Sequence, residues 1–286
     1  MQTGTLKGIH VVVLMFAVLL LAVPASDFLA SLLPDGARHR DAIGRALPFL
    51  VAGIVILAIR PLRRMVRERL VIPIPGDCRT EVVAVYGLQV AHAFAWMAAY
   101  VLWFNLVDGP VALEQRLSGA GTHVQALAAA FSTEGFVVGI VLAGILAPVV
   151  EELVFRGLLY TLWERRFGWF PSLLMTSTLF GLYHANFLPA FASAVIFTCL
   201  YRRTGSLRAP MFVHALYNLT TIYPLAGRWI FPRDFESPGD LASWKFHIAI
   251  LLAFCVAWPA YVWIARNGRE DSEGADTLPD HVVLPR

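Results

Sequence analysis

Cysteine, charged residues and zinc-binding motifs are all scarce in this sequence of 286 residues. Its three cysteines, Cys78, Cys199 and Cys255, are scattered and form no CxxC pair, which gives no basis for a disulfide framework. No HExxH motif is present either. Charged residues make up only 15% of the chain, against roughly a quarter in soluble proteins, and the net charge is +3. This small excess gives no reason to expect a nucleic acid partner.

Apolar residues, in contrast, make up 58% of the chain and gather in long runs. A helix needs about 20 of them to cross the hydrocarbon core of a bilayer. Four runs have about that length, namely Ile9–Leu33, Ala42–Ile59, Val82–Leu106 and Gly135–Leu159. Four segments are shorter or more mixed, namely Pro171–Phe187, Leu188–Tyr201, Ala209–Leu225 and Phe246–Ala265. The pattern predicts an all-α membrane protein, a bundle of about eight transmembrane helices, although residues 171–201 can also be interpreted as one broken span.

Arginine clusters between the apolar runs indicate which loops face the cytoplasm. Six arginines lie in the expected loop between the second and third helices: Arg60, Arg63, Arg64, Arg67, Arg69 and Arg79. Two more clusters fall on the same side of an eight-span bundle: Arg165 with Arg166, and Arg202 with Arg203 and Arg208. The positive-inside rule then predicts a multi-pass protein of the cell inner (plasma) membrane with both termini in the cytoplasm. The first loop, with Arg38 and Arg40, departs from this rule.

The first apolar segment has a second interpretation. Lys7, the run Val11–Ala22 and the following Val23-Pro24-Ala25 also fit a secretory signal with a cleavage site. The apolar character resumes at Phe28 and continues to Leu33, which favours an uncleaved span.

Two adjacent glutamates and an arginine lie in the fourth apolar run, where burying charge is costly and points to function. Successive helical residues are about 100° apart, so Glu151 and Glu152 cannot point the same way. Glu152 and Arg156 are four residues apart and can form an ion pair, which leaves Glu151 directed elsewhere. Pro148 removes a backbone hydrogen bond just before the acids, and a kink there could open a polar pocket. A purely structural role for all three charges is the alternative.

Two later segments add polar groups of another kind. His184 follows Phe180 by four residues, and His214 and Asn218 share that spacing, which places each pair on one helical face. Neutral histidine and asparagine side chains can donate hydrogen bonds in a dry site. Hydrolysis of an amide by water needs a general base and donors that stabilise the oxyanion. The three segments together supply a carboxylate, an imidazole that can act as a base, and a pair of donors.

These residues resemble the motifs of the CPBP family, which comprises the type II CAAX prenyl proteases and related bacteriocin-processing and immunity proteins. The three matching motifs are Glu151-Glu152-x-x-x-Arg156, Phe180-x-x-x-His184 and His214-x-x-x-Asn218. They occur in the expected order within residues 147–218, each in a predicted membrane segment. The resemblance implies a helical bundle with a catalytic cavity inside the membrane.

The resemblance also implies a role for each matching residue. Glu151 and His184 would activate the attacking water, and His214 and Asn218 would stabilise the oxyanion. Glu152, Arg156 and Phe180 would support the site. The implied activity is that of an intramembrane glutamate-dependent endopeptidase without a cofactor, acting on a membrane-associated or lipidated protein or peptide.

Three regions are expected on this basis. Residues 1–130 hold about three transmembrane helices, residues 131–226 form the catalytic helical core, and residues 227–286 contain a loop, the last transmembrane helix and a polar cytoplasmic tail. Two other functions remain open: a zinc-dependent membrane metallopeptidase, because Glu and His are legitimate zinc ligands, and a non-catalytic immunity, scaffold or transport protein.

Overall fold

The computed structural model describes residues 58–109, 140–184, 186–222 and 244–266, together with residues 51, 53–55 and 111. The regular elements of this described part are helices, with no strand among them, in agreement with the predicted all-α class. The predicted first span, Ile9–Leu33, most of the second, Ala42–Ile59, and the polar tail lie outside the described residues. The count of eight spans and the choice between a signal and a first span therefore stay predictions.

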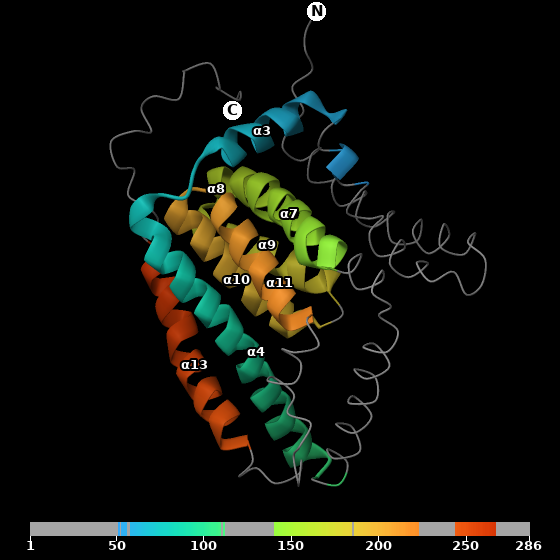
Figure 1. The fold of residues 1–286 in the computed structure, drawn as a ribbon, viewed down its shortest axis with the longest axis vertical. Coiled ribbons are helices and arrows are strands. Elements are labelled where there is room, and N and C mark those ends of the chain that lie inside the picture. Colours follow the sequence, from blue (N-terminus) through green and yellow to red (C-terminus); the bar gives the residue numbers. More distant parts are fainter. Residues whose placement is uncertain are drawn as a thin grey trace, which may run out of the picture.

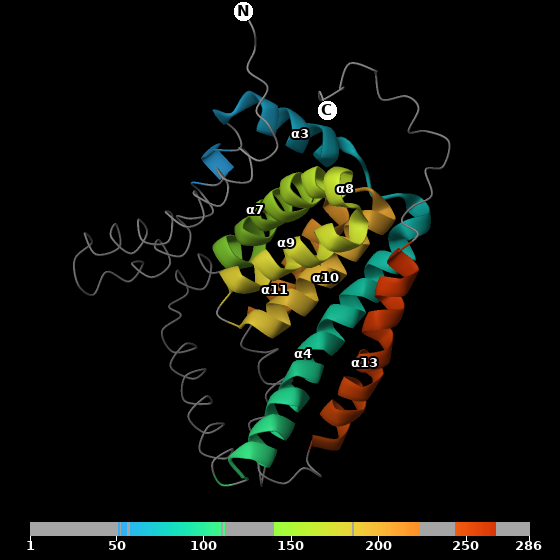
Figure 2. The ribbon, with the colours of Figure 1, turned by 180° about the vertical axis from the view of Figure 1, so that it is seen from behind.

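Two long helices lie side by side along one flank of the molecule (Figures 1 and 2). They are α4 (Arg79–Val107) and α13 (Lys245–Ala265), close to the predicted Val82–Leu106 and Phe246–Ala265. Within the described residues, these are the two helices long and apolar enough to cross a membrane. Large apolar side chains on both remain outside the core; Leu106 is 79% exposed and Val256 71%. Apolar surface of this kind is typical of helices that contact lipid.

The glutamate-bearing span is a continuous helix whose hydrogen-bonding register changes along its length. It consists of η2 (Ile140–Leu146, π-helical), α7 (Ala147–Glu152), η3 (Leu153–Tyr160, π-helical) and α8 (Thr161–Phe167). Pro148 is the second residue of α7 and therefore lies inside the continuous helix, directly after η2, where its missing N–H removes one backbone hydrogen bond. The helix continues past its predicted end at Leu159 and ends at Gly168, whose φ of 79° suits glycine. Turns of π-helix are rare in proteins, and those that occur are often found at functional sites.

Three shorter helices pack around this span: α9 (Trp169–Tyr183), α10 (Phe187–Thr204) and α11 (Arg208–Ile222). The chain leaves the helix after Tyr183 and begins α10 at Phe187, so residues 171–201 contain two helices; their crossing of the membrane as two spans, and not as one broken span, stays a prediction. Pro171, Pro189 and Pro210 are each the third residue of their helix, where the ring fits the first turn. The largest apolar core lies between η3, α9 and α10, and includes Phe155, Leu173 and Cys199.

The arginine-rich segment before α4 corrects one expectation. The sequence predicts a loop, but residues Arg60–Val71 form a helix, α3, which lies across one end of the bundle (Figures 1 and 2). Pro61 suits the first turn of this helix, and no glycine interrupts it. Its carboxyl end is held by Arg208, whose Nε donates to the Leu70 carbonyl at 2.7 Å, and by Ser206, whose Oγ donates to the Ile72 carbonyl at 2.7 Å.

The arginine clusters predicted to share one side do meet at one end of the bundle. Arg202, near the end of α10, pairs with Glu164 of α8. Arg203 reaches Glu81 in the first turn of α4, with Nε and Oε1 3.3 Å apart, and Tyr261 near the end of α13 donates to the same carboxylate at 2.9 Å. The ends of four helices therefore converge at this basic end, next to α3.

Candidate active site

Glu152 and Arg156 form the predicted ion pair. Arg156 Nη1 donates to Glu152 Oε1 at 2.8 Å, and the two side chains are 1% and 0% exposed. A buried pair of this kind persists only when its geometry is good and further hydrogen bonds satisfy the charged groups.

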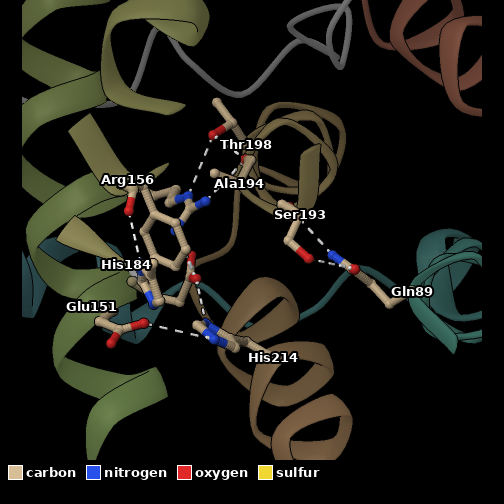
Figure 3. Close-up of polar contacts among 10 residues, drawn as sticks. Gln89, Glu151, Arg156, His184, Ser193, Ala194, Thr198 and His214 are labelled. Atoms are coloured by element: carbon tan, nitrogen blue, oxygen red, sulfur yellow. Dashed lines mark hydrogen bonds and ion pairs between the residues drawn. The ribbon is translucent and has the colours of Figure 1, made fainter. Parts of the chain in front are cut away.

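The rest of the Arg156 guanidinium is satisfied by α10 and by two aromatic rings. Nη2 donates to the Ala194 carbonyl at 2.9 Å, and Nε donates to Thr198 Oγ1 at 3.3 Å. The guanidinium carbon lies 5.0 Å from the ring centre of Phe180 and 5.4 Å from that of Phe197, within the range of cation–π attraction. Every nitrogen of the guanidinium thus has a partner in a water-poor environment (Figure 3).

His214 of α11 connects the two glutamates. Its Nδ1 lies 2.9 Å from Glu152 Oε1, and its Nε2 lies 3.6 Å from Glu151 Oε2 (Figure 3). The side chain is buried, and its ring stacks on Phe197 with centroids 4.5 Å apart. Because Glu152 is held as a carboxylate by Arg156, it can only accept a hydrogen bond, so Nδ1 of His214 carries the hydrogen.

Glu151 is the second buried carboxylate, with 6% of its surface exposed. The ion pair of Arg156 is made with Glu152, as expected, and the charged contact of Glu151 is the one with His214. The two adjacent acids therefore differ in surroundings: Glu152 is held on one oxygen by two donors, and Glu151 faces one imidazole nitrogen.

His184 lies directly after the end of α9, which corrects the expectation that it shares one helical face with Phe180. Its backbone is extended, with φ −103° and ψ 147°, directly after α9. The side chain is half-buried, and its Nδ1 lies 2.7 Å from the carbonyl oxygen of Phe180. A carbonyl only accepts, so Nδ1 carries the hydrogen and the neutral ring keeps a lone pair on Nε2.

Phe180 and Asn218 complete the set of predicted site residues. The Phe180 ring stacks on His184 with centroids 4.4 Å apart, faces Arg156, and meets His214 edge-on at 6.0 Å. It therefore separates the buried ion pair from the histidine at the helix end. Asn218 lies one helical turn after His214 on α11 and is half-buried.

Sequence reasoning missed several polar groups that support the site. Thr198 and the Ala194 carbonyl hold Arg156, and a second buried pair lies beside them: Ser193 Oγ donates to Gln89 Oε1 at 2.9 Å. Gln89 lies in the predicted span Val82–Leu106 and is completely buried. A polar residue within an apolar run was the available indication, and the pair joins α10 to α4 (Figure 3).

No group of three or more His, Cys, Asp or Glu side chains in the part of the chain that the structure describes is arranged to hold a metal ion. The buried cluster has another composition: two carboxylates, an imidazole and a guanidinium. Ionisable residues within apolar helices mark functional sites by default. By fold, the chain is a helical membrane protein, and a buried charged cluster lies between its helices.

Comparison with known proteins specifies the family that this cluster resembles. Residues 133–220 match the family described as type II CAAX prenyl endopeptidase Rce1-like. The matched segment contains all seven predicted site residues, and it confirms the resemblance drawn from the three motifs.

A curated relative is similar to part of this chain. The protein named "Putative membrane peptidase YdiL" from Bacillus subtilis (strain 168) is 30% identical over 82 residues. The alignment covers 28% of this chain and 34% of the relative. No solved structure matches the chain. Both similarities are to membrane peptidases, and both are confined to about a third of the chain or less.

Proposed function

We propose that this chain is an intramembrane endopeptidase that hydrolyses a peptide bond of a membrane-associated or lipidated substrate, with Glu151 as the general base. The observation that carries the proposal is the division of labour between adjacent acids. Glu152 is held by Arg156 and His214, whereas Glu151 makes no ion pair with the guanidinium and faces an imidazole. A buried carboxylate in such a position can take a proton from water as the water attacks a carbonyl.

His184 is the second water-activating group in this proposal. With its hydrogen on Nδ1 and bonded to Phe180, the neutral ring offers Nε2 as an acceptor. Its position at the end of α9 gives it partial exposure, in contrast to the fully enclosed ion pair. A half-exposed acceptor that stacks on Phe180, whose ring also meets His214, suits the orientation of a water molecule.

His214 and Asn218 are proposed to stabilise the oxyanion. They lie one turn apart on α11, so a carbonyl oxygen placed between them can meet both side chains. Fixed donors in a site of low dielectric constant stabilise developing charge far better than water does, because they need no reorganisation.

The exposed apolar helices and the basic end support a proposal for the cellular membrane, the orientation and the substrate of the protein. Two apolar helices expose large side chains, and the helix ends carry arginines at one end. We propose that the protein is a multi-pass protein of the inner (plasma) membrane with the basic end in the cytoplasm, and that no nucleic acid takes part. Its partners are then the bilayer and a protein or peptide substrate. The family description extends the proposal to prenylated substrates of the CAAX type.

The test is cleavage by the purified full chain in liposomes. The probe is a farnesylated peptide with a fluorophore and a quencher on either side of the expected bond, and a matched peptide without the lipid is run in parallel. We expect wild-type protein to cleave and Glu151→Gln to lose at least about 1000-fold of the rate, because the base is removed without a change in size. Equal rates for the two proteins would contradict the proposal.

Glu68→Gln is the matched control. It makes the same chemical change at an exposed glutamate, which pairs with Arg64 on α3. We expect this variant to cleave at the wild-type rate. If neither peptide is cleaved, the membrane proteins of cells producing wild type and Glu151→Gln are compared for new termini. Identical patterns would exclude a peptidase and leave the non-catalytic alternatives.

A further inference from the structure

The hydrogen bond between His214 and Glu152 restricts what His214 can do at its other nitrogen. Nδ1 donates to Glu152 Oε1 at 2.9 Å, so in the neutral ring Nε2 has a lone pair and no hydrogen. This nitrogen faces Glu151 Oε2 at 3.6 Å. A neutral His214 therefore cannot donate a hydrogen bond to an oxyanion through Nε2.

The number of protons on Glu151 and His214 decides the net charge of the buried cluster. Arg156 and Glu152 cancel one another. The charged group that faces the ring from α7 is Glu151, and His184 lies at the end of α9 (Figure 3). The other two rings in contact, Phe197 from α10 and Phe180 from α9, are uncharged. One proton added to the pair of Glu151 and His214 makes the cluster neutral as a whole. That proton can stand on Glu151, beside a neutral ring, or on His214, beside a carboxylate.

We propose that Glu151 and His214 share this single proton, and that its transfer from Glu151 Oε2 to His214 Nε2 creates the general base and the oxyanion donor in one step. The inference rests on the proposed function and deepens it. In this scheme Glu152 is a positioning residue: it fixes the ring so that Nε2, and not Nδ1, faces Glu151.

The step balances in atoms and charge. The O–H bond of Glu151 breaks and the N–H bond of His214 forms, which leaves a carboxylate and an imidazolium. The carboxylate then takes a proton from water while the water oxygen bonds to the substrate carbonyl carbon, and the imidazolium donates to the resulting oxyanion. Glu151 passes the water proton to the leaving amine nitrogen as the peptide bond breaks, and His214 returns its proton to Glu151. At 3.6 Å the first transfer needs a small closure or one bridging water, as is common before substrate binds.

The first test measures the tautomer of His214 directly and needs no substrate. Protein labelled with ¹⁵N-histidine is placed in lipid nanodiscs, and the His214 resonances are identified by their absence in His214→Asn. We expect Nδ1 to carry a hydrogen in both wild type and Glu151→Gln. A neutral ring with its hydrogen on Nε2 in either protein would overturn the proposal.

The second test separates the hydrogen bond of Glu152 from its charge. Glu152→Gln and Glu152→Leu both remove the charge partner of Arg156. In Glu152→Gln the amide oxygen takes the place of Oε1, because Arg156 and His214 both donate to that single position and select an acceptor there. Glu152→Leu offers no acceptor. We expect the hydrogen on Nδ1 in Glu152→Gln, and its loss from Nδ1 in part of the Glu152→Leu molecules.

Catalysis should follow the tautomer. We expect kcat of Glu152→Leu to be roughly 100-fold below that of Glu152→Gln, with KM alike in the two, because the substrate does not touch residue 152. Equal kcat values with the expected tautomers would show that the ring position does not govern catalysis and would overturn the positioning role. If no protein cleaves any substrate, the proposed function fails, whereas the tautomer experiment still decides whether Glu152 orients His214.

Discussion

The buried cluster and the helix α3 at the basic end each contain an ion pair between arginine and glutamate, one buried and one exposed. Arg156 and Glu152 are almost completely buried, and each further polar contact of the pair comes from another helix. Arg64 and Glu68 of α3 have the same spacing of four residues and the same distance of 2.8 Å, but their side chains are 67% and 49% exposed. The two pairs share spacing and distance, with the order of acid and base along the helix reversed, and they differ most in their environment.

The difference shows what burial adds to an ion pair. Water screens the exposed pair on α3, so breaking it leaves two charges that are still hydrated. Water does not reach the buried pair, so each of its charges is stabilised only by a few fixed partners. Substitution of an exposed charged residue at the basic end should therefore have little effect on stability. In the buried cluster, substitution of one charged residue leaves its partner buried without a counter-charge.

The largest expected effect comes from breaking the buried pair. Arg156→Met keeps much of the volume of the side chain but leaves Glu152 without its cation, and we expect a loss of about 3–5 kcal/mol of unfolding free energy. This free energy is measured by unfolding the purified protein in mixed micelles that contain an increasing fraction of a denaturing detergent. Arg64→Met makes the same change on α3 and should cost below about 0.5 kcal/mol. Similar losses in the two variants would show that burial is not what separates the pairs.

His184 sharpens the comparison because it lies at the border between the enclosed pair and the exterior. We expect His184→Ala to reduce cleavage of the lipidated peptide by at least about 100-fold while leaving the unfolding free energy close to that of wild type. The reason is that its ring packs on Phe180 at a helix end and holds no other element in place through the contacts described. Full activity in this variant would remove His184 from the mechanism.

A third prediction concerns the turn that places His184. A Cβ added at Gly181 would lie 2.9 Å from the Phe187 ring and 3.0 Å from the Phe187 carbonyl oxygen, so α9 and α10 could no longer approach as closely. We expect Gly181→Ala to cost about 1–3 kcal/mol and to lower activity through displacement of His184. Gly87→Ala is the control, because nothing lies within 4 Å of its Cβ in α4, and it should be neutral or stabilising. Equal stability of the two variants would contradict the tight contact.

The smallest expected effect is that of metal removal. Because the proposed mechanism uses a carboxylate and an imidazole, we expect a strong zinc chelator to leave the cleavage rate unchanged. Loss of activity with chelator, restored by added zinc, would favour the metallopeptidase alternative. Total metal content of the purified protein, measured by mass spectrometry, provides the independent check.

The sequence predicted those features that depend on neighbours along one helix. The spans of α4 and α13, the division of residues 171–201 into two helices and the pair of Glu152 with Arg156 all follow from apolar length or from a spacing of four residues. The contact of His214 with Glu152 does not, since it joins residues 62 positions apart and depends on how α11 packs against α7.

Two other features were beyond the sequence for different reasons. The arginine cluster predicts a cytoplasmic loop by its charge, whereas positions 60, 63, 64 and 67 are also those of one helical face, which α3 adopts. The end of α9 at His184 depends on the close approach of Gly181 and Phe187, which an apolar run alone does not reveal.

The π-helical turns on both sides of α7 make the number of residues in this helix part of the site. A π turn closes its hydrogen bond over one residue more than an α turn does, so the helix from Ile140 to Glu151 contains surplus length. Deleting one residue there would restore a regular register and turn everything on one side of the deletion by about 100° relative to the other. Either Glu151 or the start of the helix would then leave its place. For this segment a single-residue gap is a more severe change than most substitutions, and the site is encoded in spacing as well as in side chains.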